Sequence, residues 1–188
     1  MFPVGGVGVM LLGALVSGLV AFGVAALLAR RVGWVAAGAP VALAWSLVVI
    51  ALVTLIPANG APGVVPAEGR LASCSWDIGG PAPEGFWIFA GGQRTLNVLL
   101  FVPSGILLVV AAARWGWRAL VLVPLGVAVL ALLSVGLELV QLELARLDRA
   151  CDVTDVVDNV TGAVIGVVIG VGIAMLVRPW RADRRRRR

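Results

Sequence analysis

Residues 159–177, NVTGAVIGVVIGVGIAMLV, contain no charged side chain and carry a glycine at every fourth position from Gly162 to Gly170. A helix needs about 20 mostly apolar residues to cross the hydrocarbon core of a bilayer. Glycines at this spacing lie on one helical face and allow another helix to approach closely. The stretch therefore predicts a membrane-spanning helix with a packing face of small residues.

Four more charge-free stretches of similar length precede it, at residues 4–29, 34–56, 95–113 and 119–137. The whole chain is 61% apolar and 13% charged, with a mean hydropathy of +1.05. Soluble domains are typically about half apolar and about a quarter charged, so this composition argues against a water-soluble protein. We expect one all-α integral membrane domain over residues 1–180, a bundle of about five transmembrane helices, followed by an Arg-rich tail at 181–188.

Charged residues alternate between the two ends of this predicted bundle. Eleven of the 15 basic residues, all arginines, follow the first, third and fifth stretches, whereas nine of the ten acids fall in the long connections 57–94 and 138–158. Because cytoplasmic segments are enriched in Lys and Arg, we expect an N-out/C-in protein with both long connections outside. The sequence pI near 11.2 then reflects orientation, and the tail is expected to meet anionic lipids rather than nucleic acid.

The residue inventory restricts the chemistry that this chain can perform. Without histidine, it lacks the usual acid–base switch, a serine-type triad and most ligands for zinc or haem. We predict no cofactor and assign no metal site, and Mg²⁺ or Ca²⁺ held by carboxylates stays an open alternative. Cys74 and Cys151 both fall in the outer connections, where disulfides can form. We therefore predict a disulfide between them; chance placement of two unpaired cysteines on one side is the alternative.

Polar residues gather at the outer ends of the fourth and fifth predicted helices. Glu138 and Gln141 lie three residues apart, on one face of the fourth helix. Asp152 is the predicted N-cap of the fifth helix, and Asp155 then occupies its first turn, where a negative charge is favourable. Together with Asn159, these two acids are expected to form one stripe at the mouth of the bundle.

The third predicted helix carries a second group of distinctive residues. Asn97 lies one turn before Phe101, and Pro103 follows two residues later. A proline inside a membrane helix frees a backbone carbonyl, for which Ser104 or Asn97 is expected to supply a hydrogen bond. Arg94 precedes this helix, and we interpret it as an anchor at the membrane surface.

Three motifs follow one another along the chain: Asn97-x3-Phe101-x-Pro103-x-Gly105, then Glu138-x2-Gln141, then Arg149-x2-Asp152-x2-Asp155-x3-Asn159-x2-Gly162-x3-Gly166. Their order and spacing resemble the VanZ-like family of bacterial membrane proteins, over roughly residues 40 to 177. The resemblance implies a multi-pass protein of the bacterial plasma membrane. It also implies a process related to antibiotic resistance, because the name-giving member is associated with low-level resistance to the glycopeptide teicoplanin.

Two interpretations stay open for the polar cluster at the outer ends. In the functional one, an outward-facing pocket of carboxylates and Arg149 binds a polar head group. In the structural one, Asp152 caps the fifth helix and pairs with Arg149, while Glu138 hydrogen-bonds Gln141 and Asn159. For the motif of the third helix, a kinked helix whose polar groups are hydrogen-bonded is the simpler explanation.

We expect a binding protein that contributes to glycopeptide resistance or to cell-envelope homeostasis. Its expected partners are membrane lipids and either the drug or a lipid-linked wall precursor; the sequence leaves the oligomeric state open. No nucleophile or metal-ligand spacing favours an enzyme, but an intramembrane enzyme with Glu138 and Asp152 as acid and base is one alternative. A small proton-coupled transporter is another.

Overall fold

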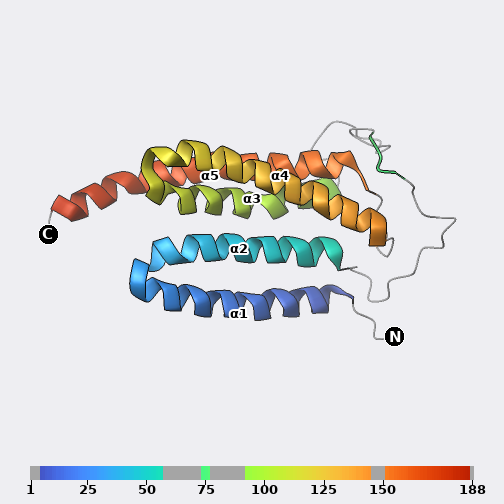
Figure 1. The fold of residues 1–188 in the computed structure, drawn as a ribbon, viewed down its shortest axis with the longest axis horizontal. Helices are drawn as coiled ribbons and strands as arrows, with labels where there is room; N and C mark the ends of the chain where they lie inside the picture. Colours follow the sequence, from blue (N-terminus) through green and yellow to red (C-terminus); the bar gives the residue numbers. More distant parts are fainter. Residues whose placement is uncertain (1–4, 57–72, 77–91, 145–150, 187–188) are drawn as a thin grey trace.

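The computed structural model describes residues 5–56, 73–76, 92–144 and 151–186. Within these ranges there are no strands beyond one isolated bridge, and the elements are α1 (Val7–Val32), α2 (Trp34–Leu55), α3 (Gly92–Ala112), the 3-10 segment η2 (Ala113–Arg118), α4 (Ala119–Leu144) and α5 (Val153–Arg186). The helices lie side by side along one direction, and α2 separates α1 from the group formed by α3, α4 and α5 (Figure 1).

Four stretches of the described residues are long and apolar enough to cross a membrane: Val7–Val32, Trp34–Leu55, Arg94–Leu142 and Val153–Leu176. The third of them is 49 residues long and contains both α3 and α4, which reverse direction at η2 and pack against each other. The prediction of an all-α protein with membrane-spanning helices is therefore confirmed. Five crossings and the N-out/C-in orientation stay predictions.

The helices are longer than the charge-free stretches that predicted them. Helix α4 continues beyond residue 137 and includes both Glu138 and Gln141, while α5 begins at Val153, well before residue 159. Most of the segment predicted as a separate tail is also helical, since α5 extends to Arg186. Backbone hydrogen bonding does not stop at the edge of an apolar run, so each helix ends where a cap or turn ends it.

Two glycines make the turns at one end of the bundle. Gly33 has φ +84° and is the one residue between α1 and α2, and Gly116 has φ +60° within η2. Residues with a Cβ rarely adopt these conformations. Arg114 and Arg118 at the second turn lie over the rings of Trp115 and Trp117, an arrangement typical of the membrane–water interface.

The central helices carry the core. Helix α1 packs against α2, where the indole Nε1 of Trp45 donates to the carbonyl oxygen of Ala14 at 3.1 Å, and α3 packs most extensively against α5. The faces that turn outward are apolar: Leu120 and Leu132 of α4 are 78% and 71% exposed. Such faces suit contact with lipid.

Candidate functional site

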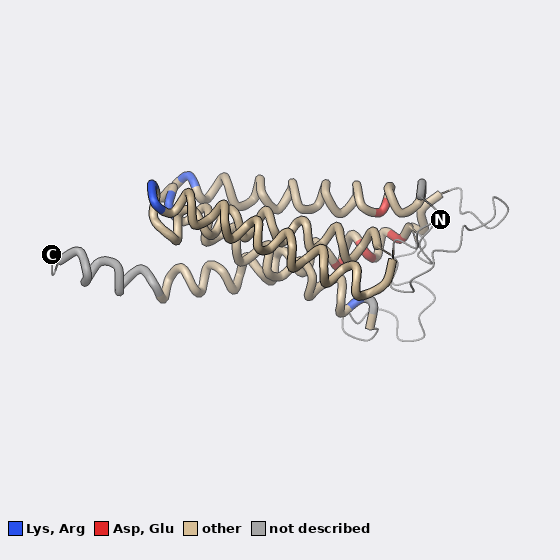
Figure 2. Tube along the Cα trace, turned by 90° about the horizontal axis from the view of Figure 1, so that it is seen from below, with Lys and Arg blue, Asp and Glu red and all other residues tan. Residues whose placement is uncertain are grey.

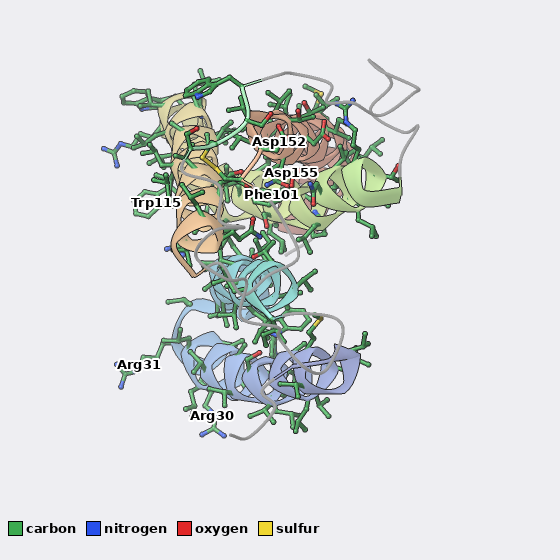
Figure 3. The ribbon with its side chains drawn as sticks, turned by 90° about the vertical axis from the view of Figure 1, so that its right-hand side faces the viewer. Arg30, Arg31, Phe101, Trp115, Asp152 and Asp155 are labelled. Atoms are coloured by element: carbon green, nitrogen blue, oxygen red, sulfur yellow. A yellow bond between two sulfur atoms is a disulfide. The ribbon has the colours of Figure 1, made fainter. Side chains whose placement is uncertain are left out.

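Charge separates along the length of the bundle. Figure 2 shows the described arginines of α1 and of the turn between α3 and α4 at one end, and the described acidic residues towards the other. We call these the basic end and the acidic end. Seen from the acidic end, Asp152, Asp155 and Phe101 lie where α3 and α5 meet, whereas Arg30 and Arg31 extend from the periphery (Figure 3).

Helices α3 and α5 meet along a stripe of glycines, which we call the glycine seam. A Cβ at Gly162 would collide with the carbonyl oxygen of Val98, and one at Gly166 with that of Val102. Gly105 reciprocates from α3, because a Cβ there would collide with the carbonyl oxygen of Ala163. The two helices run parallel, since residues further along α3 meet residues further along α5. Carbonyl oxygens that lie this close to glycine Cα atoms make favourable weak contacts.

A buried ion pair extends this seam by one turn towards the acidic end. Arg94 Nε and Nη2 each donate to the carboxylate of Asp158 at 2.8 Å. The Asp158 side chain is fully buried and that of Arg94 is 14% exposed, and the negative charges of Asp155 and Asp152 add to the attraction on the guanidinium. The interpretation of Arg94 as a surface anchor is therefore wrong, because its side chain turns inward to a carboxylate that the sequence analysis did not single out.

The start of α5 is capped by groups from the protein itself. Asp152 Oδ1 accepts from the backbone N–H of Thr154 at 2.8 Å, as predicted for an N-cap, and Ser75 O accepts from the N–H of Val153 at 3.1 Å. Glu138 Oε2 on α4 accepts from the N–H of Asp152 at 3.2 Å. These N–H groups are therefore already hydrogen-bonded. The N-terminal end of α5 is a structural junction where α5 meets α4 and residues 73–76.

A disulfide joins Cys74 to Cys151 beside this junction, so the predicted pairing is confirmed. The N–H of Ser75 also donates to the carbonyl oxygen of Cys151 at 2.9 Å. The covalent bond and the flanking hydrogen bonds together hold residues 73–76 against the start of α5.

Removal of the disulfide is expected to be destabilising. The bond closes a loop with a sequence separation of 77 residues, and we expect Cys74→Ser to lower the free energy of unfolding by about 2–4 kcal/mol. The oxidised wild type should migrate faster than the reduced protein on a denaturing gel, and Cys74→Ser should abolish that difference. Two thiols that alkylate fully without reductant would contradict the bond.

A polar layer lies one turn above the apolar centre of the bundle. Helices α2, α3, α4 and α5 each place a residue in the apolar cluster: Ile50, Phe101, Leu137 and Ala163. Four residues nearer the acidic end, about 6 Å along each helix, the same helices carry Thr54, Asn97, Gln141 and Asn159. We call these four residues the outer polar layer; each is at most 6% exposed.

The outer polar layer is only partly satisfied by hydrogen bonds. Gln141 Nε2 donates to the backbone oxygen of Thr54 at 3.0 Å, and Asn159 Nδ2 donates to Ser134 Oγ at 2.9 Å. Three buried atoms have no hydrogen-bond partner: Asn97 Nδ2, Gln141 Oε1 and Asn159 Oδ1. Each comes from a different helix, and each leaves hydrogen-bonding capacity unused in the buried interior.

Buried polar side chains extend from the acidic end to the middle of the bundle. The deepest are Ser46 of α2 and Ser104 of α3, whose hydroxyls lie 2.9 Å apart. Nearer the basic end, the buried side chains of the described residues are apolar, as at Ala37, Val109 and Ala112. Among the described residues, buried polar side chains therefore lie between the middle of the bundle and the acidic end, and the buried side chains near the basic end are apolar.

The structure sorts the predicted site residues into three groups. Asn97, Gln141 and Asn159 belong to the outer polar layer, and Asp152 and Asp155 lie between that layer and the acidic end at the start of α5, whereas Glu138 lies next to Leu137 on α4, and its side chain reaches the N–H of Asp152. Arg149 falls outside the described residues. Among the residues that are described, no group of three or more acidic or sulfur side chains is placed to hold a metal ion.

Two sets of contacts differ from those considered for the sequence. The structural interpretation had Glu138 bonding Gln141 and Asn159; in the structure the amide nitrogens of Gln141 and Asn159 donate to Thr54 and Ser134. Neither Ser104 nor Asn97 bonds the carbonyl freed by Pro103, because Ser104 pairs with Ser46 and Asn97 Nδ2 is unpartnered. Gln141 and Ser104 each bond a residue of α2 instead of a group on their own helix.

Sequence reasoning missed Asp158, Ser134 and Thr54. Asp158 lies one turn before Gly162, so continuing the four-residue spacing of the seam would have found it. Thr54 lies two turns from Ser46 on one face of α2, but a threonine at the end of an apolar stretch resembles an ordinary interfacial residue.

Fold and site together define the class: an all-α protein with membrane-spanning helices and a buried polar layer towards its acidic end. The model of the VanZ/LLP1 family matches residues 44–177, and the chain belongs to that family. The match begins within α2 and contains all four residues of the outer polar layer. Neither a curated protein nor a solved structure matches the chain.

Proposed function

We propose that this VanZ/LLP1-family protein binds a polar group of a glycopeptide drug or of a lipid-linked wall precursor in the outer polar layer. It thereby contributes to glycopeptide resistance or to cell-envelope homeostasis in the bacterial plasma membrane. The three unpartnered amide atoms of Asn97, Gln141 and Asn159 are the observation that carries the proposal. A buried polar group without a partner costs about 1–3 kcal/mol, and a bound group that supplies the missing bonds removes that cost.

The charge distribution supports a site that faces the cell exterior. The positive-inside rule puts the basic end, with Arg30, Arg31, Arg114 and Arg118, in the cytoplasm. The acidic end and the outer polar layer then lie on the outer side, where glycopeptides and exported wall precursors are found.

Binding fits the interior better than either alternative. A proton-coupled carrier needs a polar route across the membrane, whereas the buried polar side chains of the described residues reach no deeper than Ser46 and Ser104. An enzyme using Glu138 and Asp152 as acid and base needs these carboxylates at a substrate, whereas both carboxylates bond backbone N–H groups around the start of α5.

Complementation of a deletion strain tests the proposal. We expect Asn97→Leu and Gln141→Leu each to return teicoplanin susceptibility close to that of the deletion strain, because loss of one such hydrogen bond weakens binding about 10-fold or more. Membrane abundance of each variant, measured by immunoblot, should equal that of the wild type.

A hydroxyl of the same helix pair provides the control. Thr161 Oγ1 on α5 bonds only to the carbonyl oxygen of Val157 one turn before it, so Thr161→Val should complement like the wild type. If all three variants complement equally at equal abundance, the outer polar layer is not the site. If the wild type never alters susceptibility, the link to resistance fails.

A further inference from the structure

The chemistry of the unpartnered atoms restricts the ligand group further than the proposed function does. The orientation of Gln141 is fixed, because its amide nitrogen donates to the carbonyl oxygen of Thr54 and a carbonyl oxygen can only accept. The unpartnered atom of Gln141 is therefore the acceptor Oε1. A group that satisfies it must donate a hydrogen bond, which a phosphate or carboxylate oxygen that has lost its proton cannot do.

The side-chain amides of Asn97 and Asn159 add both kinds of hydrogen-bonding group. Each carries one unpartnered buried atom, Nδ2 of Asn97 on α3 and Oδ1 of Asn159 on α5. A primary or secondary amide and a pair of hydroxyls can each donate and accept at once. Such a group can supply the donor that Gln141 Oε1 lacks, whereas a group that only accepts leaves Gln141 Oε1 unsatisfied.

The charges around the layer also disfavour an anion. Glu138 lies three residues before Gln141, Asp155 lies one turn before Asn159, and both are buried. Of the side chains described at the acidic end, Arg94 is the one cation, and its Nε and Nη2 are held by Asp158. Among the described side chains, an anionic group entering the layer would meet these two carboxylates, and no second cation offsets them.

We infer that the outer polar layer takes an uncharged sugar group, bound through its hydroxyls or its acetamido group, and that the phosphate of a lipid carrier is not what the layer recognises. The inference rests on the proposed function and specifies which part of the ligand is bound. A hydroxyl or amide N–H of the sugar donates to Gln141 Oε1, and the side chains of Asn97 and Asn159 bond neighbouring polar atoms of the sugar.

Matched pairs of probes test the inference with the full chain in lipid nanodiscs. One pair is undecaprenyl pyrophosphate with and without an N-acetylhexosamine; the other is teicoplanin and its aglycone. Microscale thermophoresis should show that removal of the sugar weakens binding at least about 10-fold in the pair that binds. Asn97→Leu and Gln141→Leu should each weaken binding of the sugar-bearing probe by a similar factor, and Thr161→Val should not.

Thermal unfolding guards against misfolded variants. Because Asn97→Leu removes a buried amide nitrogen that has no partner, this variant should not unfold at a markedly lower temperature than the wild type. Gln141→Leu also removes the donor to the Thr54 carbonyl oxygen, so some loss of thermal stability is expected for it. If either leucine variant unfolds at a much lower temperature, the paired probes still test the inference with the wild-type protein, since they need no substitution.

Each outcome is decisive. Equal binding with and without the sugar overturns the inference and leaves the proposed function standing. Sugar-dependent binding that neither leucine substitution changes also overturns it, and indicates that ordered water satisfies the layer. If no member of either pair binds, the proposed function fails and the inference fails with it.

Discussion

Gly166→Ala is expected to lower the free energy of unfolding by about 3 kcal/mol. The new methyl group would collide with the carbonyl oxygen of Val102, and it would lie 2.9 Å from Gly105 Cα and 3.0 Å from the nitrogen of Ile106. All three are backbone atoms, so no side chain can rotate away, and α3 must separate from α5. Unfolding of the purified protein in mixed micelles, followed by tryptophan fluorescence, measures the change.

Gly172→Ala is the matched control on the same helix. No atom lies within 4 Å of a Cβ built at Gly172, and alanine is favoured over glycine in a helix by up to about 1 kcal/mol. The control should therefore leave stability unchanged or raise it. Equal destabilisation by both substitutions would mean that glycine is required along α5 for a reason other than contact with α3.

Asp158→Ala is expected to destabilise the protein by about 3–5 kcal/mol, because breaking a buried ion pair strands the remaining charge. The carboxylate is fully buried and accepts two hydrogen bonds from Arg94. The same unfolding measurement applies. A substantial loss is also expected for Arg94→Leu, which leaves the Asp158 carboxylate buried without the guanidinium.

The double variant Arg94→Leu with Asp158→Leu distinguishes the contribution of the ion pair to stability from the cost of leaving one charge unpaired. Replacing a buried ion pair by apolar residues is often close to neutral, so the double variant should be more stable than either single one. Arg118→Ala removes an exposed arginine from the basic end, whose contact is with the Trp117 ring, and should change stability by no more than about 1 kcal/mol. Additive losses in the double variant would contradict a direct coupling between the two charges.

The membrane-helical nature of the chain could be predicted because it depends on local composition. A run such as 159–177 must become a helix in a bilayer whatever surrounds it, since lipid offers its backbone no hydrogen bonds. Its glycines likewise predict close approach of another helix. That the partner is α3, in parallel orientation and with Gly105 in the facing position, depends on contacts between segments far apart in the chain.

The residues of the candidate site could be predicted more fully than the contacts that they make. Asn97, Gln141 and Asn159 stand out because amides are rare in apolar helices. Which helix each amide faces depends on its rotation about the bundle axis, so the partners Thr54 and Ser134 could not be deduced. Arg94 shows the same limit, since an arginine beside a membrane helix meets either water or a carboxylate, and only the packed bundle decides which.

The parallel pairing of α3 with α5 also has a consequence for the order of assembly. Arg94 and Asp158 are separated by 64 residues, which a ribosome adds in about 3–13 s at roughly 5–20 residues per second. During that interval Asp158 has not been made, so the Arg94 guanidinium lacks the carboxylate that holds it in the finished bundle. The contact between α3 and α5 can therefore form only after α5 has been made, and this part of the bundle closes late in synthesis.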